Sequence, residues 1–229
     1  MRHVRELVGA PYPAFDNRTE AGLELADFLL REGAEADVVV AVPSGGVAVG
    51  LPLAERLGLP FDLVLVRKLP LPMAPEAGFG AVSASGEVAL NQRLVYGWGL
   101  SPDVIDDVVA RVLDELRQRE EMFLIGRQRA DLSGRRLLLV DDGLASGFTM
   151  QAAVREVRRA GPRSVAVGVP DAPVGTIEAV EPLVEELYCL VAQRGGSFAV
   201  ASFYARWHDL TDREVLQLLG PPSPAHRGE

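Results

Sequence analysis

The stretch Leu137-Leu-Leu-Val-Asp-Asp-Gly-Leu-Ala-Ser-Gly-Phe-Thr149 decides the fold. The apolar run Arg136–Val140 is typical of a strand buried on both faces, as in a parallel sheet covered by helices. From Phe148 to Ala160 the apolar spacing becomes helical. The loop between them therefore joins a strand end to a helix start, which is where open α/β sheets bind ligands.

This loop makes two opposite demands on a ligand. Its glycines and the N–H groups of the following helix favour an anion, and Ser146 and Thr149 can add hydroxyl donors. Asp141 and Asp142 would repel that anion, so we expect them to hold hydroxyls, a metal or both. Ribose 5-phosphate, with a monophosphate near vicinal hydroxyls, meets both demands. An ordinary turn is the alternative, and it is disfavoured because paired carboxylates at a strand end are costly.

Two other phosphate-binding loops are excluded by spacing. A P-loop needs Gly-x-x-x-x-Gly-Lys-Ser/Thr, and no lysine lies near this loop. The dinucleotide fingerprint needs Gly-x-Gly-x-x-Gly, and Gly45, Gly46 and Gly50 do not have that spacing.

The stretch resembles the phosphoribosyl-pyrophosphate (PRPP) motif of type I phosphoribosyltransferases, an apolar strand, two acidic residues and a small-residue loop with Ser/Thr-Gly-x-Thr. The resemblance assigns Asp141 and Asp142 to the ribose hydroxyls. It assigns the loop to the 5′-phosphate; the loop residues are Gly143, Leu144, Ala145, Ser146, Gly147, Phe148 and Thr149. More loosely, in the order of its elements, it extends from roughly Val38 to Leu219.

The bulk composition fits a soluble enzyme. A chain of 229 residues with 48% hydrophobic and 24% charged residues can bury a sizeable core. No apolar run is long enough to span a membrane, no signal peptide is recognisable at Met1–Ala10, and we expect a cytoplasmic protein. The formal charge of −9 argues against nucleic-acid binding. The single cysteine, Cys189, excludes an internal disulfide and a cysteine-built zinc site.

Lys68 is the only lysine among 23 basic residues. Since arginine serves wherever a general positive charge is needed, the one lysine suggests a requirement for a compact ammonium; chance is the alternative. Lys68 follows Arg67 at the end of an apolar run, Phe61–Val66, which we interpret as a strand.

Strands alternate with helices along the chain. We expect strands at 38–42, 61–66, 136–140, 164–169 and 187–192, and helices at 17–31, 46–57, 102–126, 148–160, 174–180 and 211–219. This order predicts an α/β fold: an open, mainly parallel twisted sheet with helices on both faces.

The chain has no internal repeat and no linker, so we expect a single domain over residues 1–219. Residues 69–98 form a long connection with short alternating pieces, and the resemblance makes them a mobile lid. A small C-terminal hood is expected over 193–210. The Pro-rich tail 220–229 is expected to be disordered.

Carboxyl ends of parallel strands lie on one edge, so Pro43–Gly46, Arg67–Lys68, Asp141–Thr149 and Pro170–Asp171 can converge. Resemblance makes Gly45 and Gly46 part of a pyrophosphate loop, where relatives have a non-proline cis peptide. Ser44 stands where many members carry a basic residue, so we expect the loop to bind pyrophosphate either more weakly or through its backbone alone. A tight turn before a helix is the alternative for this loop.

The chemistry implied by the resemblance is displacement of pyrophosphate from C1 of the ribose by a nitrogen nucleophile. Lys68, Asp141 and Asp142 are the expected catalytic residues, and Arg67 is expected to share the charge on the pyrophosphate. The expected cofactor is Mg²⁺, held through PRPP and in part by the acidic pair, without a metal site built only from the protein.

The acceptor is less well defined. Members that act on hypoxanthine and guanine carry an aspartate where this chain has Ala145, which argues against that reaction. Phe198 falls where purine-specific members stack the base, and Tyr204 and Asp171 are further acceptor candidates. Core packing for the aromatic residues, and an N-terminal cap of the helix near Val174 for Asp171, are the alternatives.

We therefore expect a phosphoribosyltransferase that uses PRPP and a small-molecule acceptor. A PRPP-binding regulatory protein without transfer, or a phosphoribosyl hydrolase, remain alternatives. Resemblance suggests a homodimer, and the helix at 102–126 is either a subunit contact or a sheet-covering helix.

Overall fold

The computed structural model describes residues 1–4 and 13–221. Most of the predicted disordered tail, residues 222–229, lies outside the described part of the chain, as do residues 5–12.

A six-stranded parallel sheet forms the centre of the molecule, with strand order β1-β9-β8-β7-β2-β3. Its strands are β1 (Arg2–Val4), β2 (Val38–Ala41), β3 (Phe61–Leu63), β7 (Arg136–Val140), β8 (Ser164–Pro173) and β9 (Glu186–Gln193). The predicted parallel α/β sheet is confirmed. The edge strand β1 was missed because three residues are too short for a periodic signal.

The direction in which strands are added reverses between β2 and β7. From β2 the chain adds β3 on one side, and from β7 it adds β8 and then β9 on the other. Val38 pairs with Leu137 and Ala41 with Val140, so the two strands end level. The loops that follow them flank a topological switch point, the usual ligand crevice of an open α/β sheet.

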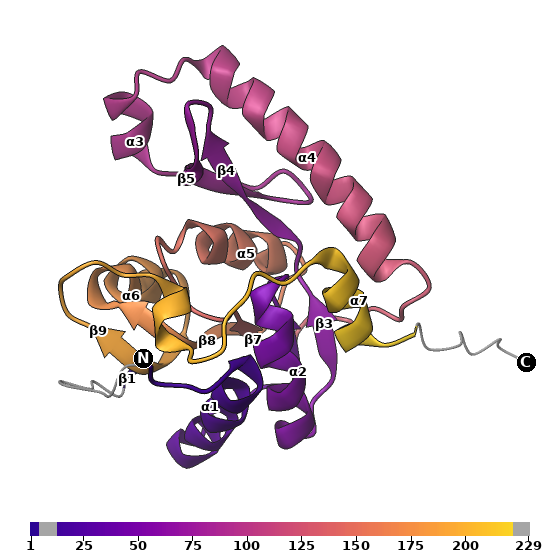
Figure 1. Ribbon diagram of the computed structural model, residues 1–229. Helices are drawn as coiled ribbons and strands as arrows, with labels where there is room; N and C mark the ends of the chain where they lie inside the picture. Colours follow the sequence, from indigo (N-terminus) through magenta and orange to yellow (C-terminus); the bar gives the residue numbers. More distant parts are fainter. Residues whose placement is uncertain (5–12, 222–229) are drawn as a thin grey trace, which may run out of the picture.

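Helices cover both faces of this sheet, as Figure 1 shows. On one face lie α1 (Arg18–Glu32) and α2 (Gly45–Leu57), and on the other α5 (Phe148–Arg158) and α6 (Val174–Val180). The alternation of side chains fixes this arrangement: Val38 and Val40 pack with the α5 and α6 side, whereas Val39 packs with α1 and α2. At roughly 25 cal/mol per Å² these buried side chains supply the main drive for folding.

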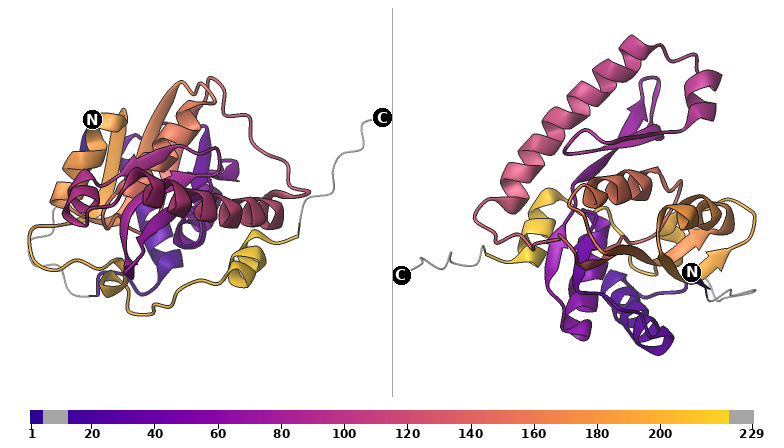
Figure 2. Two further views of the ribbon diagram at one scale, coloured as in Figure 1. Left: turned by 90° about the horizontal axis from the view of Figure 1, so that it is seen from above. Right: turned by 180° about the vertical axis from the view of Figure 1, so that it is seen from behind.

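Residues 66–124 form a second unit, here called the antiparallel lobe. It holds β4 (Val66–Leu71), β5 (Ala74–Ser83) and β6 (Val88–Leu90) as a three-stranded sheet, followed by α3 (Gln92–Gly97) and α4 (Pro102–Leu124). Figure 2 shows α4 running along the lobe, which rises above the central sheet.

The lobe corrects two predictions. The strand expected at 61–66 is two strands, because β3 ends at Leu63 and β4 begins in the other sheet at Val66. Residues 69–98 are not an irregular connection: Leu69, Phe79 and Val82 are buried in a cluster that includes α4 residues. Such packing counts against an irregular lid, and the mobility of residues 69–98 as a lid stays a prediction.

The C-terminal part returns across the edge of the sheet. After β9 come a short 3₁₀ turn at Val200–Phe203 and α7 (Asp212–Leu219), whose predicted capping box between Thr211 and Glu214 is present. We name residues 204–211 the strap. Ala205 N donates to Phe15 O, and Arg206 N to Asp16 O, so the strap is fastened to the segment before α1. None of the described helices is long and apolar enough to cross a bilayer.

Candidate functional site

The N-terminus of α2 lies against the acidic pair at the switch point. The peptide bond between Pro43 and Ser44 is cis, and α2 begins at Gly45 without a side-chain cap. A Cβ on Gly45 would lie 1.8 Å from Asp142 Oδ2, and one on Gly46 2.7 Å from the carbonyl oxygen of Val140. Only glycine at both positions allows the two loops to approach this closely.

Hydrogen bonds within the motif loop and to β8 and α6 fix its shape. Asp142 N donates to Asp141 Oδ1 at 2.9 Å, and Leu144 N to the main-chain oxygen of Asp171 at 2.9 Å. Thr176 Oγ1, at the start of α6, donates to Ala145 O at 2.7 Å. These contacts hold the loop on the end of β8, so its shape is set before any ligand arrives.

The end of this loop leaves backbone donors unpaired. Gly147 is the N-cap of α5, has φ of 78° and supplies no side-chain cap. Because the first intrahelical bond runs from Gln151 N to Gly147 O, the amides of the first turn have no partner within the helix. Ser146 is exposed beside them. This arrangement suits a phosphate.

Asp142 is ion-paired rather than free. Arg18, the first residue of α1, donates from Nε to Asp142 Oδ2 at 2.8 Å, and only 9% of the arginine side chain is exposed. The guanidinium carbon lies 3.7 Å from the centroid of the Trp207 ring, and Nη1 donates to His208 O. Arg18 therefore connects the acidic pair to the strap.

The two carboxylates differ in electrostatic environment. Burial raises the pKa of Asp141 well above its usual value, and the adjacent Asp142 charge raises it further. Burial also raises the pKa of Asp142, but the Arg18 charge opposes this effect. Both residues keep part of their surface exposed at the switch point. We infer that Asp142 is the more readily ionised of the pair.

Tyr204 contacts the backbone of the acidic pair. It is 4% exposed, and its hydroxyl donates to the main-chain oxygen of Asp142 at 2.6 Å. Its ring contacts Phe15 and Trp207. The structure therefore gives this predicted acceptor residue a different contact: it supports the backbone of the motif.

Asp171 is fully buried near the end of β8. Within the described part of the chain, neither carboxylate oxygen has a hydrogen-bond partner. Burial raises its pKa well above the usual value, and the charges of Asp142 and Asp141 add to the effect. The predicted capping role is wrong, because β8 continues to Pro173, which is the N-cap of α6.

Asp171 nevertheless lies directly under the motif loop. A Cβ on Gly143 would be 2.7 Å from Asp171 Oδ1 and 2.8 Å from Val200 of the C-terminal segment. Phe198, the predicted stacking residue, is partly buried, with its ring 5.2 Å from that of Phe203. Stacking on an acceptor remains a prediction for Phe198.

Arg67 and Lys68 lie within β4 and not, as predicted, at the carboxyl end of a central strand. Successive side chains of a strand point to opposite faces, which separates the pair. Arg67 reaches α4, where its Nε lies 2.7 Å from Glu115 Oε2. Lys68 shares a face with Val66, which packs with the α5 side of the core. The stem of Lys68 lies over Gly78, where a Cβ would be 2.4 Å from its Cγ.

Two arginines at the site were missed by the sequence analysis. Arg18 lies within the predicted capping box at 17–20, where Asn17 and Glu20 follow the capping pattern and Arg18 itself does not. Arg119 of α4 donates from Nη2 to Ser44 Oγ at 2.9 Å, and from Nε to Asp212 Oδ1 at 3.0 Å. No pattern in the sequence connects residues 75 positions apart.

The donor set suits a magnesium ion only in combination with a ligand. Within the described residues there is no group of three His, Cys, Asp or Glu side chains able to hold a metal. Asp141 and Asp142 offer hard carboxylate oxygens at the switch point. Mg²⁺ is commonly bound by one or two carboxylates plus substrate phosphates, and these residues fit that use.

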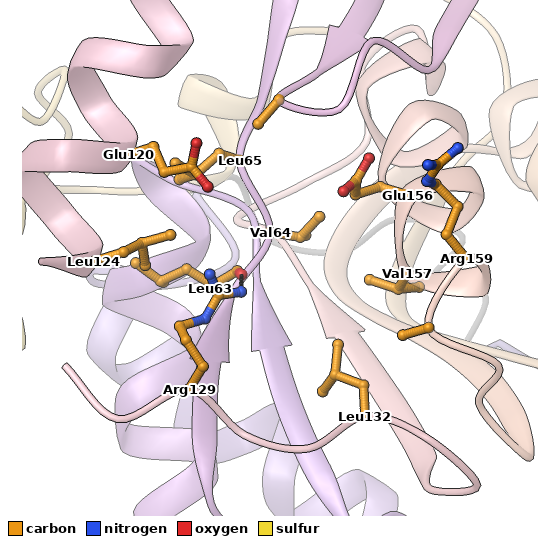
Figure 3. A pocket seen from close by; sticks show the side chains of 12 residues that line it. Leu63, Val64, Leu65, Glu120, Leu124, Arg129, Leu132, Glu156, Val157 and Arg159 are labelled. Atoms are coloured by element: carbon orange, nitrogen blue, oxygen red, sulfur yellow. Dashed lines mark hydrogen bonds between the residues drawn. The ribbon is translucent and has the colours of Figure 1, made fainter.

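A cavity of about 370 Å³ lies elsewhere, where the lobe joins the central sheet. Figure 3 shows Val64 and Leu65, the connection from β3 to β4, facing side chains of α4 and α5 such as Glu120 and Val157. None of the predicted site residues lines it.

Comparison with known proteins agrees with this geometry. The sequence model of the phosphoribosyl transferase domain family matches residues 16–176, which include both loops of the switch point. The chain belongs to this family. It is 38% identical over 213 residues to a protein of Mycobacterium tuberculosis (strain H37Rv). The name of that relative assigns it only provisionally as a phosphoribosyl transferase. That match covers 93% of this chain and 47% of the relative, so the chain spans about half the length of the curated relatives it matches.

Two further comparisons extend this result. The crystal structure of the protein TT1426 from Thermus thermophilus is 37% identical, with a TM-score of 0.72 and coverage of 90% of this chain and 97% of that one. An amidophosphoribosyltransferase of Rhizobium etli is 26% identical over 68% of this chain and 24% of its own length. The phosphoribosyl transferase domain of this chain therefore has the fold predicted from the motif.

Proposed function

We propose that this phosphoribosyl transferase domain moves the 5-phosphoribosyl group from PRPP to a nitrogen of a small base or amine, with release of pyrophosphate. The observation that carries the proposal is that α2 begins against the acidic pair and α5 begins at the end of the loop that follows this pair, both without a side-chain cap. PRPP has two anionic ends separated by a diol, and this arrangement offers two anion sites separated by carboxylates.

Each end of PRPP has its own set of contacts in this proposal. The 5-phosphate binds the first-turn amides of α5, with Ser146 and Thr149 adding hydroxyl donors. The pyrophosphate lies at the loop Pro43–Gly46. Asp141 and Asp142 accept hydrogen bonds from the ribose hydroxyls, and Asp142 does so while Arg18 holds it in place.

In the reaction the bond from C1 to the pyrophosphate oxygen breaks and a bond from C1 to the acceptor nitrogen forms. The electron pair leaves with pyrophosphate, and the acceptor gives up one proton. Catalysis by this chain is mainly positioning and charge stabilisation, because no covalent nucleophile is needed. Asp141 and Asp142 place negative charge beside the cationic sugar, and Lys68 approaches the leaving group from the lobe.

Magnesium is the expected cofactor. When bound, Mg²⁺ would supply positive charge shared between pyrophosphate and ribose oxygens. Asp141 and Asp142 are the residues of this chain that would contact it.

The acceptor is expected on the side of Gly143 that faces the C-terminal segment. Val200 lies against Gly143 there, and Phe198, two residues earlier, is expected to offer an apolar ring. Asp171 lies beside Gly143, and within the described residues its two carboxylate oxygens have no hydrogen-bond partner. A buried carboxyl group in this position favours an acceptor that carries a ring N–H or an amino group.

The test is incubation of the full chain with PRPP, Mg²⁺ and a panel of bases and amines while pyrophosphate is measured. Release that depends on one acceptor supports transfer. Release without an acceptor identifies a hydrolase, and tight PRPP binding without release identifies a sensor. Failure to bind PRPP would refute the proposal.

A further inference from the structure

Helix α4 places a guanidinium group against the Pro43–Gly46 loop. Arg119 Nη2 donates to Ser44 Oγ at 2.9 Å, and the side chain is only 11% exposed. Ser44 is the residue just before α2, and its own side chain makes no capping bond to the helix. The donor and the hydroxyl therefore lie at the end of α2 that is free to bind an anion.

A pyrophosphate at this loop needs positive charge that the loop itself lacks. The residues Pro43, Ser44, Gly45 and Gly46 carry no charge, and Asp142 lies against Gly45. The carboxylate would repel a multiply charged anion at this distance. The dipole of α2 is equivalent to roughly half a charge, which does not balance a diphosphate.

The other arginine at the switch point is already engaged. Arg18 is paired with Asp142 and stacked on Trp207, so its charge serves the acidic pair. Arg119 has a different counter-ion: Asp212 at the start of α7, with 38% of its side chain exposed. Water weakens the hold of an exposed carboxylate on its partner. Asp212 Oδ1 accepts from both Nε and Nη2 of Arg119, so it orients the guanidinium. Because this carboxylate is partly exposed, it offsets only part of the positive charge at the loop.

The position of Arg119 on α4 also connects it to β4 of the lobe. Arg119 follows Glu115 by one helical turn, so both side chains project from one face of α4. Glu115 pairs with Arg67 on β4 at 2.7 Å. One face of α4 therefore contacts β4 through Glu115 and the switch point through Arg119.

We propose that Arg119 is a cation of the pyrophosphate site in addition to Lys68, supplied by α4 because position 44 of the loop is a serine. This inference rests on the proposed function and adds to it a substrate-binding residue outside both loops. Arg119 donates to a pyrophosphate oxygen, sharing it with Ser44 Oγ and the first amides of α2.

Titration calorimetry with two separate ligands tests this role. Inorganic pyrophosphate with Mg²⁺ probes the α2 end of the site, and ribose 5-phosphate probes the α5 end. We expect Arg119→Gln to weaken pyrophosphate binding by at least tenfold and to leave ribose 5-phosphate binding within about twofold, as expected for loss of a charge-assisted hydrogen bond. The control is Arg117→Gln, an exposed arginine of the same helix, which should change neither affinity.

Asp212→Asn separates binding from a structural role. This variant removes the charge of the counter-ion and weakens the contact between α4 and α7 but keeps the cation, so pyrophosphate affinity should be unchanged or higher. A loss equal to that of Arg119→Gln would make Arg119 a structural contact and overturn the inference. This variant also decides the question if Arg119→Gln does not fold.

Different results would overturn the role of Arg119 and the proposed function. A wild-type chain that binds both ligands, with Arg119→Gln indistinguishable from it, overturns the role of Arg119 alone. A wild-type chain that binds neither ligand overturns the proposed function, and this inference with it.

Discussion

Arg18 Nε lies 2.8 Å from Asp142 Oδ2, and this pair joins the first residue of α1 to the second acid of the motif. The arginine is stacked on Trp207, so the pair also fixes the strap. An acidic residue proposed to hold ribose hydroxyls is thus oriented before the ligand arrives. Burial raises the pKa of Asp142, and the Arg18 charge opposes this effect.

Arg18→Gln should lower the free energy of unfolding by about 3 kcal/mol, since it leaves a poorly solvated carboxylate without its partner. Denaturant titration measures this change. Arg56→Gln is the matched control: its pair with Asp27 is about half exposed and should contribute less than 1 kcal/mol. Equal losses in the two variants would show that the Arg18 pair has no special role.

Gly45→Ala should weaken PRPP binding by at least tenfold. Alanine normally stabilises a helix by roughly 0.5–1 kcal/mol relative to glycine. Here the new Cβ would lie 1.8 Å from Asp142 Oδ2, so the carboxylate or the loop must move. Calorimetry with PRPP and Mg²⁺ gives the affinity. Gly175→Ala, where no atom lies within 4 Å of the added Cβ, should bind normally. Normal binding by Gly45→Ala would mean that the two loops do not form one site.

Asp171→Asn should change how stability depends on pH. The pKa of Asp171 is raised by burial, so its favourable contribution is complete below the unfolded pKa of about 3.9 and is lost as pH rises through the folded value. At pH 8 the wild-type chain therefore carries a cost that asparagine avoids, of about 1–3 kcal/mol.

Denaturant titrations of both chains between pH 4 and pH 8 measure this difference. The stability of Asp171→Asn relative to the wild type should grow with pH. A constant difference would show that the pKa of Asp171 is the same in the folded and the unfolded chain.

Lys68→Arg should reduce turnover by at least tenfold although it keeps the charge, because a planar guanidinium cannot replace a compact ammonium beside a leaving group. Arg67→Lys should have a smaller effect, since Arg67 points to Glu115 on α4. Initial rates of pyrophosphate release, with the acceptor found in the panel, compare the two. A near-normal rate for Lys68→Arg would make the single lysine a matter of chance.

Local sequence patterns predicted the elements well. The run Arg136–Val140 is β7 as expected, the Asn17 side chain caps α1, and the capping box at Thr211 opens α7. The helix expected over 174–180 is α6. Each of these depends on neighbours within about four residues, so short-range physics determines them.

The sequence predicted contacts between distant residues less well. The apolar run Phe61–Val66 contains no glycine or proline, so nothing marks Val64 and Leu65 as the point where the chain leaves one sheet for another. For the same reason Arg67 and Lys68 were placed at a strand end instead of on opposite faces of β4. Of the site, the two acids and the glycine loops were predicted from local signals, whereas Arg18 and Arg119 depend on contacts across 124 and 75 residues.

The most direct test of the central claim is a crystal structure of the chain with PRPP and Mg²⁺. The account predicts the 5-phosphate on the first-turn amides of α5, the ribose hydroxyls on Asp141 and Asp142, and the pyrophosphate at Gly45. PRPP bound elsewhere, or bound with the acidic pair out of contact with the ribose, would contradict it.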